Sequence, residues 1–461
     1  MVKAILLKKS AAWQNLLTQM GICYKILEET GSPANHNDCQ LFIINGSLDV
    51  ETCKCLEESH IDKIAVITTP EASRTAVKES IRTDIVVNGD KYYFDRPLVF
   101  YQKSDRIVKK SSFLPFSLDE AFKWKGSIRK QFYSKQKEMP TENVRKTNLQ
   151  EVFRFTWNFL LDALEEKKLI PVTSSLLPDN RPLFIFRIDT DFATERDTVE
   201  LYEICRKHNI NASWFVDVHS EKLLSAYTKF TEQEIALHCD RHYVYRKMEP
   251  NERNIVRANQ ALLNAGLAPR GFAAPFGAWN PELEKVLFAH DYLYSSEFAY
   301  AYDALPIIRW QENKRILQIP VHPINPGRLR RSHFREQEIG EYFIDYIRQC
   351  SSRGVPAIIY HHPSLILNAL IPRIFEYVNK HEFNNLTMEN YAIWWLKRAE
   401  NLCRIKSDEV LMTTELKRDI INYPADYERI YKKSWRYWLH EWEARKARLY
   451  FKRNGYPQYL D

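Results

Sequence analysis

The clearest pattern of apolar and polar positions lies near the middle of the chain. An apolar run, Leu183–Phe186, is followed by Asp189 and Asp191, and a second run, Ile235–Leu237, is followed directly by His238. Short apolar runs are typical of buried strands, and polar residues just beyond them stand where a strand leaves the core. The pattern therefore predicts two buried strands whose ends carry carboxylate and imidazole groups.

Helical and strand-like segments continue to alternate as far as Trp395. A helix is expected over Val199–Lys207, a strand over residues 210–218, and a late strand over residues 356–361. Strands that alternate with helices predict βα units and a mainly parallel sheet. We therefore expect an α/β domain over residues 181–400.

The same alternation occurs at the start of the chain. The expected elements are a helix over Ala11–Met20 and strands at Lys3–Leu7, Leu41–Asn45, Ile64–Thr68 and Ile85–Asn88. They predict a small parallel α/β domain over residues 1–90. Residues 41–48 resemble the strand and turn of flavodoxin-like or amidotransferase-like domains. Because no amidotransferase nucleophile is evident, we expect a scaffold or a binding accessory.

Two further segments flank the expected central domain. Residues 91–180 are interpreted as a connector with a helix over Leu149–Lys168, where apolar residues recur at helical spacing. Residues 401–461 form a tail, and its part 410–461 is rich in basic and aromatic residues. That part predicts either a helix that contacts anionic lipid head groups or a helix whose tryptophans pack on the preceding domain.

Composition narrows the functional classes. The chain has 461 residues, 45% hydrophobic and 27% charged, as in soluble proteins of two or three domains. Only 12 glycines argue against glycine-rich phosphate loops, and a net charge of +7 does not by itself indicate nucleic-acid binding. Eight scattered cysteines without a secretion signal indicate free thiols in a reducing cytoplasm.

The polar residues at the two strand ends suit a metal centre. An aspartate with His238 and His242 offers a divalent metal such as zinc three ligands and leaves a position open for water. A second carboxylate can act as the base on that water. Each part is common by itself, because Asp-x-Asp pairs often form turns and histidines four residues apart often lie on one exposed helix face.

The order of the motifs resembles the polysaccharide deacetylase (NodB-homology) family of carbohydrate esterases over Phe184–Trp395. In chain order the motifs are Asp189-Thr190-Asp191, His238 with His242, Arg270 with Pro275 and Phe276, and an apolar strand followed by His361 and His362. The Asp-x-Asp form is most similar to the branch that includes lipid-linked formamido-arabinose deformylases. The resemblance implies a distorted (β/α) barrel and metal-dependent removal of an acyl group from an amino sugar.

The resemblance also implies a role for each matched residue. The implied metal ligands are Asp191, His238 and His242. Asp189 would take a proton from water, and Arg270 would pair with Asp189 and keep it ionised. Pro275 and Phe276 would form the oxyanion site, with the backbone N–H of Phe276 facing the developing charge.

A histidine at the end of the last strand would protonate the departing amine. We prefer His362, which directly precedes Pro363, and keep His361 as the alternative. Adjacent strand residues face opposite ways, so only one of the two can point into the site. Because Thr190 separates the two aspartates, their roles as base and ligand could be exchanged.

Several polar residues lack a clear match to the family pattern. The fourth motif of the family is an aspartate that tunes the catalytic histidine, and Glu297 and Asp303 are the candidates here. Cys239 is interpreted as a packing residue. His322 and His333 are expected to be exposed.

The leading prediction is a cytoplasmic hydrolase that uses a divalent metal, with zinc as the expected ion. It would remove an N-acetyl or N-formyl group from an amino sugar in cell-surface polysaccharide or glycolipid biosynthesis. Peripheral contact with the inner membrane face through residues 410–461 is one option, and no nucleic-acid partner is expected. The alternatives are an inactive barrel that binds carbohydrate or serves as a scaffold, and a hydrolase acting on an O-ester.

Overall fold

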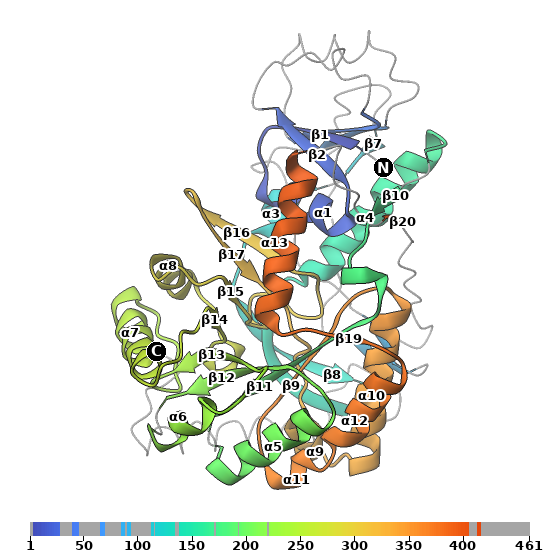
Figure 1. Cartoon of the computed structure of the whole chain (residues 1–461). Coiled ribbons are helices and arrows are strands. Elements are labelled where there is room, and N and C mark those ends of the chain that lie inside the picture. The colour runs from blue at the N-terminus through green and yellow to red at the C-terminus, as the bar shows by residue number, and fades with distance from the viewer. Residues whose placement is uncertain are drawn as a thin grey trace.

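The computed structural model describes residues 3–27, 39–45, 65–69, 84–87, 90–93, 112–114, 116–133, 138–169, 172–191, 193–218, 221–404 and 413–415. A small sheet from the first part of the chain and a larger sheet from the middle organise these residues (Figure 1). Of the basic aromatic tail, only Thr413–Glu415 (β20) is described, paired with Val172–Ser174 (β10). The prediction for residues 410–461 therefore lies outside the described residues.

The small sheet is parallel throughout, with the strand order β2-β1-β3-β4-β7. Its elements are β1 Lys3–Leu7, α1 Ala11–Met20, β2 Cys23–Leu27, β3 Leu41–Asn45, β4 Ala65–Thr69 and β7 Ser112–Phe113. Ser10 caps α1 by accepting a hydrogen bond from the backbone N–H of Trp13, and Gly21 ends the helix at a φ of 69°. The predicted helix and the first three predicted strands are confirmed.

The fourth predicted strand belongs to a different sheet. β5 (Asp84–Val87) pairs antiparallel with β6 (Asp90–Tyr93), and β8 (Ser127–Tyr133) and β9 (Glu138–Arg145) complete a four-stranded sheet. The parallel interpretation was wrong because only Asn-Gly separates β5 from β6 in the sequence. That dipeptide is typical of a two-residue antiparallel hairpin.

The large sheet has the strand order β16-β17-β15-β14-β13-β12-β11-β18, with β19 beside β11. Its strands are β11 Leu183–Asp189, β12 Ala212–Asp217, β13 Glu234–Cys239, β14 Gly271–Phe272, β15 Tyr294–Ser295, β16 Ile307–Gln311, β17 Lys314–Gln318, β18 Ala357–His361 and β19 Asn384–Asn385. Neighbouring strands are parallel except β16 with β17. Among the described residues the end strands β16 and β18 do not pair. The expected α/β domain is therefore confirmed as a mainly parallel sheet, whereas the distorted (β/α) barrel stays a prediction.

Helices connect and cover the strands (Figure 1). They are α3 Leu118–Phe122, α4 Leu149–Glu166, α5 Glu195–Lys207, α6 Glu221–Tyr227, α7 Met248–Asn264, α8 Pro281–Ala289, α9 Pro326–Arg331, α10 Glu336–Ser352, α11 Leu365–Asn368, α12 Ile371–Lys380 and α13 Met388–Arg404, with short 3-10 turns at Pro178–Asn180 and Pro275–Gly277. The predicted connector helix is confirmed as α4. No helix in the described ranges is long and apolar enough to cross a membrane.

Strand β11 lies between β12 and β18 in the large sheet, and all of its residues are buried. Its apolar side chains explain the strongest hydrophobic run of the sequence. Its two charged residues, Arg187 and Asp189, are two positions apart, so their side chains project from the same face of the strand. The strand therefore delivers a buried charged pair to its carboxyl end.

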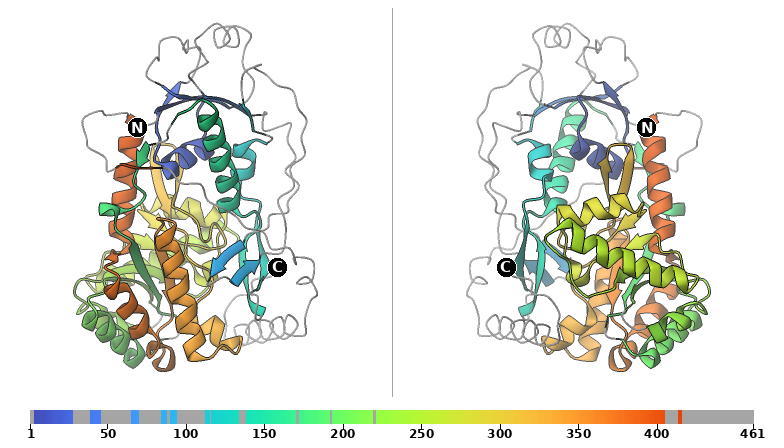
Figure 2. Two further views of the ribbon diagram at one scale, coloured as in Figure 1. Left: turned by 90° about the vertical axis from the view of Figure 1, so that its right-hand side faces the viewer. Right: turned by 90° about the vertical axis from the view of Figure 1, so that its left-hand side faces the viewer.

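Helix α13 extends from the large sheet to the small one (Figure 1, Figure 2). Arg398 in this helix is 4% exposed and donates hydrogen bonds to the carbonyls of Thr18, Ser174 and Ser175. The two sheets are thus joined by buried polar contacts. The division of the chain at residues 90, 180 and 400 stays a prediction, and the small sheet takes its last strand from beyond residue 90.

Candidate metal centre

The three predicted metal ligands lie together where β11 and β13 end. Asp191 follows β11, His238 is in β13, and His242 is in the loop after β13. One ligand atom from each residue lies within 4.8 Å of the other two. Within the described part of the chain, no other group of acidic, histidine and cysteine side chains meets this condition.

His242 lies in a bend and not on a helix. The backbone N–H groups of Asp240 and Arg241 donate to Oδ1 of Asn254 in α7, at 3.2 and 2.8 Å. The side-chain amide of Asn254 thus stabilises the bend after β13. In this bend, Nε2 of His242 lies 3.4 Å from Oδ2 of Asp191. The four-residue spacing therefore brings two histidines together from a strand end and the following loop.

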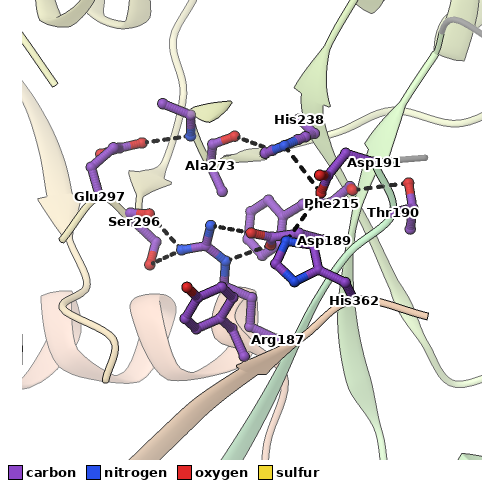
Figure 3. A network of polar contacts seen from close by, with 12 residues as sticks. Arg187, Asp189, Thr190, Asp191, Phe215, His238, Ala273, Ser296, Glu297 and His362 are labelled. Atoms are coloured by element: carbon purple, nitrogen blue, oxygen red, sulfur yellow. Dashed lines mark hydrogen bonds and ion pairs between the residues drawn. The ribbon is translucent and has the colours of Figure 1, made fainter. Parts of the chain in front are cut away.

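His238 presents one ring nitrogen to the site. Its Nδ1 lies 2.6 Å from the carbonyl oxygen of Ala273 (Figure 3). A carbonyl can only accept, so Nδ1 carries the proton and Nε2 carries a lone pair. Nε2 is buried, has no hydrogen-bond partner among the described residues, and lies 3.8 Å from Oδ1 of Asp191. A backbone carbonyl on the far nitrogen is how proteins orient metal-binding histidines.

The charge state of this group suits a divalent cation. Burial lowers the pKa of His242 to about 4, so the ring is neutral at pH 7 and can donate a lone pair. Burial by itself would raise the pKa of Asp191, but His362 and His242 beside it lower that pKa by more than burial raises it. The carboxylate is therefore ionised. One carboxylate and two imidazoles form a ligand set that zinc accepts, with a position left for water.

Asp189 pairs with an arginine that the sequence interpretation did not single out. Nε and the second terminal nitrogen of Arg187 each lie 2.7 Å from a carboxylate oxygen of Asp189. Both residues are buried, at 0% and 4% exposure. The predicted pairing of Arg270 with Asp189 is wrong, because Arg270 is half-exposed and lies 2.9 Å from Glu389.

The remaining donors of Arg187 fix its guanidinium group. Nη1 donates to the backbone oxygen and the side-chain oxygen of Ser296, at 2.6 and 3.0 Å (Figure 3). The rings of Phe215 and Tyr360 lie 5.1 and 5.4 Å from the guanidinium carbon. The signal for this pair was in the sequence, since residues two apart on a strand share a face, but the family motif pointed to a later arginine.

The two aspartates have separate surroundings. Between them, the hydroxyl of Thr190 turns away to β12, where it contacts the backbone of Phe215 and Asp217. Asp189 is held by its arginine, whereas Asp191 faces the histidines (Figure 3). This arrangement favours Asp191 as the metal ligand and leaves Asp189 as the second carboxylate.

Of the two adjacent histidines, His362 faces the centre. Its Nε2 lies 3.2 Å from Oδ1 of Asp191, and the side chain is 34% exposed. Burial lowers the pKa of His362, but the Asp191 carboxylate raises it more, so the net shift is upward. His361 points the opposite way, is fully buried, and lies 3.0 Å from Oδ1 of Asn368, as the alternation along a strand requires.

The predicted oxyanion segment borders the same centre. Pro275 begins a 3-10 turn, and Phe276 within it has a φ of 57°, which is rare for a residue with a side chain. The Phe276 ring is 37% exposed and packs edge-on against His242, with 4.4 Å between ring centroids. Gly277 follows at a φ of 56°, and an added Cβ there would lie 2.3 Å from the Phe298 ring.

Neither candidate for the fourth motif contacts His362 in the described structure. Glu297 is buried and accepts hydrogen bonds from the backbone N–H of Ala274 and from Gln318. Asp303 lies 2.7 Å from Nδ1 of His322. The expectation that His322 is exposed is wrong, since only 2% of it is exposed.

No protein-family model matches the sequence, and no curated protein matches it. Several solved structures align with about half of the chain. A putative polysaccharide deacetylase from Mycobacterium smegmatis is 15% identical, with 54% of this chain and 97% of that chain covered and a TM-score of 0.41. A probable polysaccharide deacetylase from Pseudomonas aeruginosa is 17% identical, with 51% and 97% covered and a TM-score of 0.42.

A third aligned structure is described as a CE4 family pseudoenzyme from Bacillus anthracis. It is 12% identical, with 46% of this chain and 66% of that chain covered and a TM-score of 0.36. The chain is thus structurally similar to polysaccharide deacetylases over about half its length. At these identities and scores, function has to be inferred from the geometry of the centre.

Proposed function

We propose that this protein is a metal-dependent hydrolase that removes an N-acyl group from an amino sugar. The observation that carries the proposal is the composition of one strand-end site. It combines an Asp-His-His ligand set, a second carboxylate held by a buried arginine, and a histidine beside the ligands. A hydrolytic metal centre needs these three parts, namely an open ligand set, a base and an acid.

Asp191, His238 and His242 would hold the metal. When bound, a divalent ion supplies a Lewis acid that polarises an acyl carbonyl and lowers the pKa of a water molecule. Asp189 takes the proton of the attacking water, and Arg187 keeps its carboxylate oriented through two hydrogen bonds. The buried, bidentate contact leaves Asp189 little freedom to rotate, which favours proton transfer from one fixed direction.

His362 supplies the proton that the departing amine needs. Its raised pKa favours the protonated ring near neutral pH, as a general acid requires. Phe276 borders the ligands, and its backbone N–H is the proposed donor to the oxyanion. The predicted role of Arg270 is withdrawn, and Arg187 takes its place.

The finer assignment concerns the acyl group and the carrier. The Asp-x-Asp motif supports an acetyl or formyl group on an amino sugar, and a lipid-linked or polymeric carrier would place the reaction in cell-surface polysaccharide or glycolipid synthesis. Zinc is the proposed ion because one carboxylate and two imidazoles are common zinc ligands. We place the protein in the cytoplasm, with contact to a membrane surface only through residues 410–461.

The first test is metal content, measured by mass spectrometry on the wild type and on His238→Ala. We expect about one equivalent of zinc or another transition metal in the wild type and little in the variant. His381→Ala serves as the control, since this exposed histidine lies outside the site. If neither the wild type nor the control holds metal after zinc is added, the hydrolase proposal fails.

A second measurement separates hydrolysis from binding. Acetate and formate release from N-acetyl and N-formyl amino sugars would be assayed with the metal-loaded protein. Release of either acid supports the hydrolase and identifies the acyl group. If metal and sugar both bind but no acid is released from any amide or ester substrate, the alternative of a carbohydrate-binding protein is correct.

A further inference from the structure

The parallel pairing of β14 with β15 changes its pattern beside the metal centre. The two strands are neighbours in the large sheet, and the N–H of Ser296 donates to the carbonyl of Phe272 at 3.0 Å. In a regular parallel ladder, the next bond would run from the N–H of Ala274 to the carbonyl of Ser296. In this structure the N–H of Ala274 donates instead to Oε1 of Glu297, at 3.1 Å.

This change leaves the carbonyl of Ser296 to another donor. Nη1 of Arg187 donates to that carbonyl at 2.6 Å and to the Ser296 hydroxyl at 3.0 Å (Figure 3). Arg187 in turn holds Asp189 through two hydrogen bonds of 2.7 Å. The side chain of Glu297 thus accepts from a backbone donor, so that a backbone acceptor can serve the arginine that orients Asp189.

The same contact fixes the peptide that orients His238. The N–H of Ala273 donates to the carbonyl of Leu237 at 3.0 Å, and the carbonyl of Ala273 lies 2.6 Å from Nδ1 of His238 (Figure 3). The following N–H, that of Ala274, is the group that Glu297 accepts. The segment just after β14 is therefore held by β13 on one side and by Glu297 on the other.

The carboxylate of Glu297 is itself held in place. It is 0% exposed, and its Oε2 accepts from Nε2 of Gln318 at 2.8 Å. Oε1 of that glutamine accepts from the Ser295 hydroxyl at 2.9 Å. Burial of a carboxylate costs free energy unless polar partners compensate it, and these partners supply the compensation. They also keep the other carboxylate oxygen on the backbone N–H of Ala274.

We propose that Glu297 is a positioning residue for both halves of the metal centre. By accepting a backbone N–H, it fixes the carbonyl that orients His238. Through the same contact, it leaves the carbonyl of Ser296 to Arg187. This role differs from the one that the family resemblance implied, which was to tune the histidine at the end of the last strand. The proposal rests on the proposed function, because it takes His238 as a metal ligand.

The test measures zinc affinity, with the full-length protein and zinc alone as the probe. Zinc is competed against a chromophoric chelator at pH 8, because burial raises the pKa of Glu297 to about 7 and the carboxylate should be ionised. Glu297→Leu is of similar size but lacks the acceptor. We expect zinc to bind to this variant about 10-fold more weakly or worse, as is typical when a partner that orients a ligand is lost.

Glu297→Gln is the conservative variant and should restore the affinity. Its amide oxygen can accept from the N–H of Ala274, and the amide of Gln318 can turn to accept from the new NH2 group while the Ser295 hydroxyl accepts in its place. We therefore expect zinc to bind to Glu297→Gln as it binds to the wild type. If Glu297→Gln binds zinc as weakly as Glu297→Leu, the acceptor is not the cause and the proposal is overturned.

Glu234→Leu is the matched control. Glu234 is another buried glutamate of the large sheet, but it accepts from the Tyr294 hydroxyl and from the backbone N–H of Glu389. We expect Glu234→Leu to lower stability, as Glu297→Leu does, and to bind zinc with wild-type affinity. An equal loss of zinc affinity in both leucine variants would report a general effect of the substitution and would overturn the proposal.

A second readout follows the ring of His238. In protein labelled with 15N at histidine, the Nδ1 proton of His238 is assigned by comparison with His238→Ala. It should exchange with water faster in Glu297→Leu than in the wild type. Gln318→Leu removes the donor that holds Glu297 and should change zinc affinity and proton exchange in the same direction, so it decides the question if Glu297→Leu does not fold. Wild-type zinc affinity and slow proton exchange in the folded variant would overturn the proposal.

The contact with Arg187 has its own readout. At saturating zinc, Glu297→Leu should still lower kcat, because the Ala274 N–H then competes with Arg187 for the carbonyl of Ser296. A wild-type kcat under these conditions would overturn the role in orienting Arg187. The proposed function is judged separately, because it fails only if the wild type holds no metal or releases no acid, whereas the role of Glu297 is judged by comparing variants.

Discussion

At the scale of single residues, Arg187 and Arg270 pair with carboxylates in two different ways near the candidate metal centre. Arg187 is buried and makes two parallel contacts with Asp189, whereas Arg270 forms a half-exposed pair with Glu389. Breaking a buried pair leaves an uncompensated charge, while an exposed pair contributes about 0–1 kcal/mol to stability. Only the first should matter for catalysis.

We therefore predict that Arg187→Lys lowers kcat by about 100-fold, because an ammonium group cannot reproduce the bidentate contact that orients Asp189. The metal content should stay close to that of the wild type, since Arg187 contacts no ligand of the proposed ion. Arg270→Lys is the matched control and should keep both the rate and the metal. A wild-type rate in Arg187→Lys would contradict the positioning role.

The residues of the site were predictable to different degrees. Local periodicity predicted strand ends that carry Asp and His, whereas the choice of Asp191, His238 and His242 as ligands came from the family resemblance. The three side chains do lie together, and their role as metal ligands stays a prediction. Arg187 was missed because the family motif pointed to a later arginine, and because its contact with Ser296, which is distant in the sequence, is encoded by no local pattern. The burial of His322 likewise depends on Tyr342 and Asp303, contacts that no local pattern encodes.

Glu234 allows a test of stability against pH. It begins β13, is 7% exposed, and accepts hydrogen bonds from the Tyr294 hydroxyl and from the backbone N–H of Glu389. Burial raises its pKa from 4.5 to about 7. The folded protein thus retains this proton to higher pH than the unfolded chain, so the associated stability is present below pH 4.5 and is lost as the pH rises to about 7.

We predict that the free energy of unfolding of the wild type, measured by urea denaturation, falls between pH 5 and pH 8 by more than that of Glu234→Gln. The difference should be about 3 kcal/mol at most. The glutamine variant is less stable overall, and the readout is the change of its stability with pH. Glu282→Gln is the control, because Glu282 is an exposed partner of Lys285. Parallel pH profiles for the wild type and Glu234→Gln would refute the prediction.

At the scale of elements, α1 of the small sheet completes the edge of the large one. Among the strands that the structure describes, β16 pairs only with β17. On its other side the Asn15 side chain donates to the carbonyl of Ile308 at 3.0 Å and accepts from its N–H at 2.6 Å. The amide thus takes the place of a neighbouring strand residue, which satisfies an edge that would otherwise be unpaired.

Asn15→Leu should lower the free energy of unfolding by about 3 kcal/mol, since two backbone groups of Ile308 would lose their partner in a buried setting. Urea denaturation measures the loss, and faster hydrogen exchange at the Ile308 amide assigns it to β16. Gln260→Leu is the matched control, because Gln260 bonds to Asn264 on the exposed face of α7. If Ile308 exchanges at the same rate in Asn15→Leu as in the wild type, Asn15 does not complete the edge.

The type and approximate limits of most elements were predictable, because apolar periodicity records which residues a strand or helix buries. Lys3–Leu7, Ala11–Met20 and Leu41–Asn45 were predicted with the limits that the structure shows. The partner of a strand is harder to predict. The strand predicted at Ile85–Asn88 was assigned to the parallel sheet because its composition fits either sheet, whereas β5 pairs antiparallel with β6.

At the scale of the whole molecule, the question is whether the large sheet can fold without the small one. Arg398 lies in α13, beyond the last strand of the large sheet, and its three carbonyl partners belong to residues before 181. Burial lowers the pKa of Arg398 to about 10, which still leaves it charged at neutral pH. Removing its partners would leave the buried guanidinium group of Arg398 without hydrogen-bond acceptors, or would expose it to solvent, at the junction.

Apolar packing crosses the same junction. Trp279, in the segment just before α8, packs on Trp124, with 4.8 Å between ring centroids. Tyr300 and Ile307 belong to the apolar cluster that contains Trp13. A fragment of residues 181–404 would expose these side chains, so we predict that it binds a hydrophobic dye, melts without cooperativity, and recovers a cooperative transition when co-expressed with residues 1–180. In the full chain, Arg398→Ala should lower the melting temperature, because the substitution removes the buried contacts of the junction. If the fragment alone is monomeric and melts cooperatively, the two sheets are independent domains and the junction is only a contact surface.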